Sequence, residues 1–296
     1  MDILSLITGD GGILSFIMLM LFFFIYPRLM VLQMTWKLES QLKELEEYAI
    51  KTQNLVAKRV NKTPDKDLKK QVANFMNFFI STPVDVDPYG IMPKIEHIMK
   101  QSERRFDYFV NRVAPKMTAV EKANLKFGVI GALGVNQIYK VVRHYVITIK
   151  KTSNLQLAMI LQMSMPMLMK LAKANVKATQ AFLHGIPIGD AIGPIVVAGY
   201  KTKDGVEIAR DVLLSEEKLS GKKVFVMKSK GPGGALGELG HAVERIHKKS
   251  KIDYIITIDA AGKMEGETTG DVAEGVGVMM GGIGVERSQI ENVAVT

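Results

Sequence analysis

The sequence predicts a C-terminal α/β domain with a mostly parallel sheet, preceded by an N-terminal transmembrane helix and an α-helical region. Three observations support this fold class. Residues 13–26 are uncharged and apolar, several segments between residues 30 and 133 repeat apolar positions at helical spacing, and residues 222–258 read as strand, helix, strand. The expected domains are an anchor at 1–28, an amphipathic helix at 29–62, a helical region at 63–184 and an α/β domain at 185–296.

Composition narrows the classes of function. The chain of 296 residues has no cysteine, which excludes disulfides, thiolate metal sites and cysteine nucleophiles. Its formal charge of +9 suits an anionic membrane surface or nucleic acid. The lysines are interleaved with acids and no aromatic–basic signature occurs, so we expect a membrane partner and no nucleic acid.

The N-terminal run has the length of a membrane anchor. Extended back to Ile3, it reaches about the 20 residues that a bilayer requires. Asp2 and Asp10 precede the run and Arg28 and Lys37 follow it, so the positive-inside rule predicts an outside N-terminus and a cytoplasmic remainder. We therefore expect a single-pass protein of the cell membrane. The alternative is a buried core helix.

The middle of the chain is predicted to be helical. Apolar or small residues recur at gaps of four and three between Val31 and Val56, which is a heptad pattern. Two interpretations stay open: a coiled coil that forms a homo-oligomer, or one amphipathic helix that folds back on its own domain. Thr118 and Glu121 form a predicted capping box. Residues 155–171 are apolar and rich in methionine but short for a bilayer, so a buried helix is expected there, and the alternative is that this segment enters the membrane.

The C-terminal part changes to an α/β pattern. Residues 222–228 and 252–258 read as strands on either side of a helix at 236–249, with glycines at 231–234 as the first turn. The second strand is almost continuously apolar, which is typical of a parallel sheet that is buried on both faces. Ligands of such sheets gather at the carboxyl ends of the strands, where the glycine turn and Asp259 are expected.

The glycine turn suggests an anion site. Successive backbone N–H groups before a helix N-terminus can cradle a phosphate, and Gly231, Gly233 and Gly234 would supply them. Asp259 would then bind the ribose of a nucleotide. The alternative is that these glycines only permit a tight turn between strand and helix.

A second hypothesis is a hydrolytic metal site. Asp190 and Asp259 would converge on a divalent metal ion, with His241 as the third ligand. The acid–base candidates are Glu265, Glu267 and Glu286. The alternatives are a helix N-cap for Asp190 and a solvated helix face for His241.

A resemblance supports the metal hypothesis. Residues 189–194 (GDAIGP), followed by a strand that ends at Ile258, Asp259 and Ala260 and then by a glycine-rich segment, are similar to the hydrogenase-maturation endopeptidases and a related sporulation-protein family. This resemblance implies a phosphorylase/hydrolase-like α/β fold with metal bound at Asp190 and Asp259. No histidine follows Asp259, so His241 would have to supply the family's third ligand from upstream.

The whole chain resembles an uncharacterised archaeal membrane-protein family. The anchor, the helical middle and residues 274–286 (EGVGVMMGGIGVE) support this resemblance, which implies a location and an architecture and no reaction. The last residues, 292–296, read like the middle of a strand, so we expect further sequence after them.

Three functions follow from these patterns. The first is a metal-dependent hydrolase or peptidase-like activity at Asp190 and Asp259. The second is a nucleotide or phosphate sensor that uses the loop 231–234, and the third is a non-catalytic oligomeric membrane scaffold. The expected partners are the membrane, further copies of the chain, and a small-molecule or peptide ligand.

Overall fold

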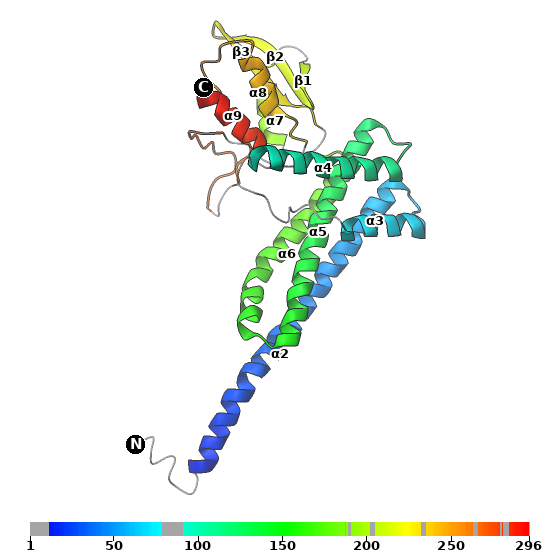
Figure 1. The fold of residues 1–296 in the computed structure, drawn as a ribbon, viewed down its shortest axis with the longest axis vertical. Coiled ribbons are helices and arrows are strands. Elements are labelled where there is room, and N and C mark those ends of the chain that lie inside the picture. Colours follow the sequence, from blue (N-terminus) through cyan, green and yellow to red (C-terminus); the bar gives the residue numbers. More distant parts are fainter. Residues whose placement is uncertain are drawn as a thin grey trace. The chain divides into compact units, whose positions relative to one another are not determined.

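The computed structural model describes residues 12–78, 91–186, 188, 191–201, 205–231, 235–262, 266–278, 280 and 284–295. Of these, 68% are helical, and the sheet that they contain has three antiparallel strands (Figure 1). The predicted mostly parallel α/β domain is therefore wrong. The chain divides into two compact units, one made of residues 1–77 and 129–179 and the other of residues 78–128 and 180–296.

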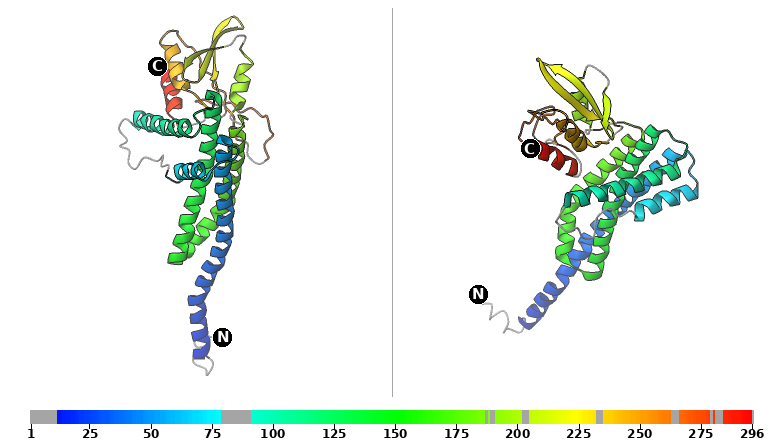
Figure 2. Two further views of the ribbon diagram at one scale, coloured as in Figure 1. Left: turned by 90° about the vertical axis from the view of Figure 1, so that its right-hand side faces the viewer. Right: turned by 45° about the horizontal axis from the view of Figure 1, so that its top comes forward.

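The first unit is a helical bundle. It contains α2 (Gly12–Val60), α3 (Lys66–Phe78), most of α5 (Ala119–Thr152) and most of α6 (Leu155–Leu183). Helices α5 and α6 form an antiparallel hairpin that lies along α2 (Figures 1 and 2). Ser153 turns the chain between them at a φ of 51°, and the Asn154 side chain accepts a 2.9 Å hydrogen bond from the Leu157 N–H to start α6.

The heptad pattern of α2 is buried inside this unit. Leu38, Leu45 and Val56 have exposed fractions of 0%, and the first two share a core cluster with residues of the α5–α6 hairpin. The pattern holds two buried threonines. The Thr35 hydroxyl donates to the Val31 carbonyl at 2.6 Å and the Thr52 hydroxyl donates to the Ala49 carbonyl at 3.0 Å, so both polar positions are satisfied within the helix. The pattern therefore belongs to one amphipathic helix that packs on its own domain. A homo-oligomer stays a prediction.

Helix α6 confirms a helix at 155–171 but is buried on one face only. Met165 is fully buried and Met169 is 7% exposed, while Met163 and Met167 are 81% and 76% exposed. By length and composition, α2 and α6 could both cross a membrane. Only 6% of the most apolar window of α2 is buried within the protein, against 28% for α6.

The second unit contains a small sheet and four helices among the described residues. Its elements are α4 (Ile91–Val113), α7 (Ile192–Ala198), β1 (Val206–Ala209), β2 (Val212–Leu219), β3 (Lys222–Ser229), α8 (Leu239–His247) and α9 (Val285–Val295). The strand order is β1-β2-β3, and each neighbouring pair is antiparallel. Ser220 and Gly221, with φ values of 50° and 79°, make the two-residue turn between β2 and β3.

The predicted strand–helix–strand unit is present only in part. β3 and α8 confirm the first strand and the helix. The predicted strand at 252–258 is not assigned as a strand, and among the described residues only β2 pairs with β3. The segment keeps a strand-like alternation, because Ile255 and Thr257 are half-buried while Tyr254 and Ile256 are exposed. An apolar alternating run becomes a strand only where a neighbour completes the ladder.

Candidate functional site

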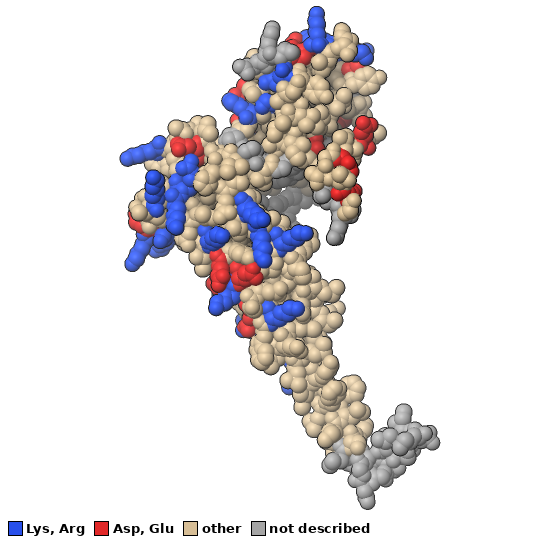
Figure 3. All heavy atoms as spheres, turned by 180° about the vertical axis from the view of Figure 1, so that it is seen from behind, with Lys and Arg blue, Asp and Glu red and all other residues tan. Residues whose placement is uncertain are grey.

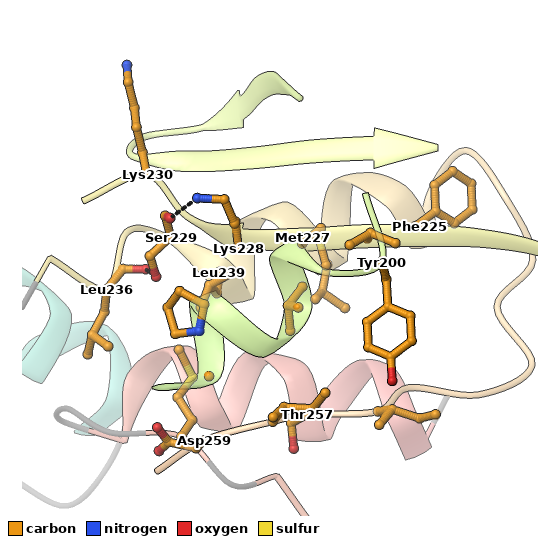
Figure 4. A pocket seen from close by; sticks show the side chains of 18 of the residues that line it. Tyr200, Phe225, Met227, Lys228, Ser229, Lys230, Leu236, Leu239, Thr257 and Asp259 are labelled. Atoms are coloured by element: carbon orange, nitrogen blue, oxygen red, sulfur yellow. Dashed lines mark hydrogen bonds between the residues drawn. The ribbon is translucent and has the colours of Figure 1, made fainter. Parts of the chain in front are cut away.

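A cavity of about 650 Å³ lies in the second unit beside β3 (Figure 4). Every residue from 224 to 231 lines it, and so does every residue from 255 to 259. A cavity over one face of a strand would touch alternate residues, because successive side chains point to opposite faces. The cavity therefore borders the outer edge of β3, the edge that does not pair with β2.

The walls of the cavity are mainly apolar. α7, α8 and α9 each contribute to them, and the contributing side chains include Val197, Leu239, Val243 and Ile290. The rings of Tyr200 and Phe225 lie at one end (Figure 4). A cavity of this volume with an apolar lining and few polar groups is typical of a site for a small molecule.

Cationic groups stand at the other end of the cavity, where β3 runs into Gly231. Lys230 is already paired, since its Nζ lies 2.6 Å from Glu207 Oε2. The half-buried Lys228 donates to the Ser229 carbonyl at 3.4 Å, and no ion pair of Lys228 occurs within the described part of the chain (Figure 4). Lys228 is therefore the cation that has capacity to bind an anionic group.

Asp259 lies on the opposite wall of the cavity (Figure 4). It is half-buried, and its Oδ1 accepts a 2.8 Å hydrogen bond from the N–H of Ala260. The neighbouring Ile258 carbonyl approaches α7 so closely that a Cβ added at Gly193 would lie 2.4 Å from its oxygen. Gly193, a glycine of the 189–194 motif, is thus required for the packing of α7 against this wall.

The residues predicted to bind metal are only partly located. Asp190, Gly233, Gly234 and Glu265 lie outside the described residues. Asp259 and Gly231 line the same cavity, which His241 does not line. Glu267 is exposed. Over the described ranges, no group of three or more His, Asp or Glu is arranged to hold a metal ion.

His241 instead belongs to a charged cluster between α4, α8 and α9. Its Nε2 lies 3.3 Å from Glu96 Oε1 and its Nδ1 lies 3.6 Å from Glu244 Oε2. Glu286 accepts a 2.5 Å hydrogen bond from the N–H of Gly240, at the start of α8. Burial raises the pKa of Glu286, whereas a hydrogen bond from Lys100 holds the pKa of Glu96 below its usual range. This cluster joins three helices and does not line the cavity.

Sequence reasoning missed the residues that define the cavity. Lys228 and Phe225 carry no motif, because their role follows from which edge of β3 is left open, and Tyr200 joins them from the turn that follows α7. Glu96 was missed as the partner of His241 because 145 residues separate the two in the sequence.

Two family models match the chain over nearly its whole length. The family described as "Protein of unknown function (DUF1512) N-terminal domain" matches residues 12–185, and "Domain of unknown function (DUF1512) C-terminal" matches residues 188–296. Neither description names an endopeptidase. No curated protein and no solved structure matched the chain.

Proposed function

The chain belongs to the DUF1512 family, and from this premise we propose that it is a membrane-anchored protein that binds a small amphipathic anion in the cavity beside β3. The observation that supports this function most directly is the composition of the cavity. An apolar chamber of about 650 Å³ ends at a lysine that forms no ion pair among the described residues.

The first part of α2 supports the anchor. Its side chains from Phe16 to Phe23 are exposed and apolar, and Figure 3 shows this length of the helix without blue or red surface. Large apolar patches on soluble proteins are usually covered by a partner or a membrane. A bilayer removes this surface from water without any further protein contact. In this proposal the N-terminus is outside and the remaining chain is cytoplasmic, because Arg28 and Lys37 follow the run.

The two ends of the cavity support an amphipathic ligand. An apolar body would lie against Val197, Leu239 and Ile290, with the rings of Tyr200 and Phe225 at its far end. A carboxylate or phosphate would accept a hydrogen bond from Lys228 and would reach the backbone near Gly231. Gly231 begins the loop that the sequence predicts to bind phosphate. Asp259 on the facing wall would accept a hydrogen bond from a hydroxyl or amine of the ligand.

A metal-dependent hydrolase at Asp190 and Asp259 is the second candidate. The observation that favours it is the half-buried position of Asp259 in the wall of the cavity. Metal analysis of the purified protein and of Asp259→Asn separates the two candidates. Stoichiometric metal that is lost in Asp259→Asn supports the hydrolase, and metal-free protein that still binds an organic anion supports the first proposal.

The direct test uses 1-naphthyl phosphate, which is water-soluble and has an apolar body and an anionic group. The full chain is placed in nanodiscs with ¹³C-labelled methionine methyl groups, because Met227 and Met280 both line the cavity. We expect their two signals to shift with 1-naphthyl phosphate, and to shift less with inorganic phosphate or 1-naphthol. Met227→Leu and Met280→Leu assign the signals.

Lys228→Met is the informative variant, and Lys222→Met on the same strand is its matched control because Lys222 does not line the cavity. A charge-assisted hydrogen bond contributes about 1.5–3 kcal/mol, so Lys228→Met should weaken the binding of 1-naphthyl phosphate by roughly tenfold or more. Lys222→Met should bind as wild type. Equal binding by both variants, or unshifted methyl signals with all three probes, would refute the proposed site.

A further inference from the structure

The α5–α6 hairpin of the first unit exposes an apolar face. Ile160, Met163 and Met167 are exposed on α6 at helical spacing, and Ile147 is exposed near the end of α5. These side chains belong to the same hairpin whose other face buries α2. A contiguous apolar face of this kind marks a site of contact with a protein or a membrane.

The charge of the hairpin identifies the class of partner. Residues 122–189 contain nine Lys or Arg residues and no Asp or Glu, although the chain has 30 acids in all. Lys150 and Lys151 stand at the tip, next to the turn at Ser153. An exposed apolar face beside lysines, without acids, is typical of segments that lie in the interface of an anionic bilayer.

The register of the helices sets the level of this tip along α2. Lys173 Nζ on α6 lies 3.3 Å from Glu44 Oε1, and Lys150 near the end of α5 pairs with Glu39. α6 runs in the same direction as α2, and Lys173 lies level with Glu44. The start of α6 is 18 residues before Lys173, and Pro27 is 17 residues before Glu44. Both helices rise by the same distance per residue, so the start of α6 lies close to the level of Pro27. The Lys150–Glu39 pair sets the far limit, because Glu39 lies 12 residues beyond Pro27, about 18 Å at a rise of about 1.5 Å per residue. The two ion pairs therefore place the tip between the end of the uncharged run and about 18 Å beyond it.

The part of this range nearest Pro27 lies in the headgroup layer if α2 is the anchor. The hydrocarbon core is about 30 Å thick and the headgroup layers bring the total to about 40–45 Å. Exposed apolar side chains of α2, Leu29, Leu32 and Trp36, continue past Arg28 at the same level. Tryptophan and basic residues together are typical of the membrane–water boundary.

We propose that the α5–α6 tip inserts into the headgroup layer of an anionic membrane, with its methionine face on the lipid and Lys151 among the phosphates. This inference rests on the anchor of the proposed function and goes beyond its ligand site. The hairpin lies on the membrane and does not cross it. α6 packs on the part of α2 that carries Lys43 and Glu44, and a crossing would draw these charges into hydrocarbon.

The chain has no cysteine, so a single introduced cysteine carries the only fluorophore, whose depth in the membrane can then be measured. Single cysteines replace Ile160, Met163 or Met167 in the full chain and carry the environment-sensitive fluorophore NBD. The protein is reconstituted in vesicles of phosphatidylglycerol and phosphatidylcholine with a spin label near the headgroup. We expect quenching to be strongest at position 160, weaker at 163 and weakest at 167, because α6 leads away from the tip.

Two further positions serve as controls. Phe22→Cys on the anchor should be strongly quenched by a spin label deep in the acyl chain, and Lys69→Cys on α3 should not be quenched by any label. Lys151→Glu should reduce the quenching at position 160 at least about twofold in vesicles with phosphatidylglycerol, while the matched change Lys69→Glu should leave it unchanged.

The outcomes that overturn the inference are distinct. Labels at 160 and 163 that behave like the label at 69, while Phe22→Cys is quenched, would leave the anchor in place and refute the hairpin contact. Blue-shifted emission at 160, 163 and 167 without lipid quenching would show that a second copy or another protein covers the face. An unquenched label at Phe22 would refute the anchor itself.

Discussion

The burial of the α2 heptad pattern against the α5–α6 hairpin leads to a quantitative prediction. Leu45 has an exposed fraction of 0% and lies in the core cluster that α2 shares with the α5–α6 hairpin, whereas Ile50, five residues later, is 52% exposed. Leu45→Ala removes three buried carbon atoms and leaves a cavity that fixed helices fill only in part. Buried Leu→Ala substitutions of this type lower the free energy of unfolding by about 3–5 kcal/mol, and we expect a loss of about 3 kcal/mol here.

The assay is thermal unfolding of the full chain in detergent, followed by the fluorescence of its one tryptophan, Trp36 on α2. For a chain of this size a change of about 1 kcal/mol in the free energy of unfolding shifts the melting midpoint by roughly 2–4 °C. Leu45→Ala should therefore lower the midpoint by about 6–12 °C. The matched control Ile50→Ala should change the midpoint by less than about 2 °C.

Protein concentration separates the two interpretations of the pattern. In the intramolecular packing, the midpoint of wild type and of Leu45→Ala is independent of protein concentration. In a coiled coil between copies, the midpoint would rise with concentration, because association stabilises by mass action. A concentration-dependent midpoint, or a loss below about 1 kcal/mol in Leu45→Ala, would refute the packing described for α2.

Two further predictions concern packing and pH. Gly131→Val in α5 should destabilise the first unit by about 2–3 kcal/mol in denaturant unfolding, because its Cβ would lie 2.7 Å from Thr179 Oγ1 and 3.2 Å from the Thr179 nitrogen. The matched change Gly275→Val, where no atom lies within 4 Å, should be neutral, and equal effects of the two would contradict this reasoning. Burial raises the pKa of Glu286, so its favourable contribution is present below the pKa of the unfolded chain and is lost as pH rises through the folded pKa. Glu286→Gln, which keeps an acceptor for the Gly240 N–H, should therefore raise the melting temperature at pH 7 by about 1–3 °C and give no gain below about pH 4. A variant that melts below wild type at pH 7 would show that the ionised carboxylate is net stabilising.

Local patterns predicted local structure well. The capping box at the start of α5 is confirmed, since the Thr118 hydroxyl accepts from the Glu121 N–H at 3.3 Å and Glu121 Oε2 accepts from the Thr118 N–H at 3.0 Å. β3 and α8 lie where apolar periodicity places them. These features depend on residues within one or two turns of each other, which the sequence shows directly.

The sheet was mispredicted because its direction depends on a turn that went unrecognised. Ser220 and Gly221 both adopt positive φ, which is the geometry of the tight turn that joins antiparallel strands. A Ser-Gly pair between the apolar runs of β2 and β3 is a sequence signal for such a hairpin. The segment 252–258 has the composition of a buried strand, but composition does not supply the neighbouring strand that would complete a ladder.

The site was predictable only in part, because it also depends on which strands lie next to each other. Gly231 and Asp259 were singled out from the sequence and do line one cavity. The open edge of β3 that makes Lys228 part of the site arises from the order of the strands, and no spacing in the sequence encodes that order.

The central claim is that the cavity beside β3 holds a ligand. Val197 of α7 lines the cavity, while Val196, the preceding residue of the same helix, does not and is exposed. Val197→Trp should fill the apolar end, and Val196→Trp should add the same side chain outside it. Native mass spectrometry of the full chain, released from membranes of the expressing cells, measures the mass of any bound small molecule.

We expect wild type and Val196→Trp to carry the same bound mass and Val197→Trp to lack it. Protein without any bound mass, or the same bound mass in all three, would contradict the claim that this cavity is the binding site.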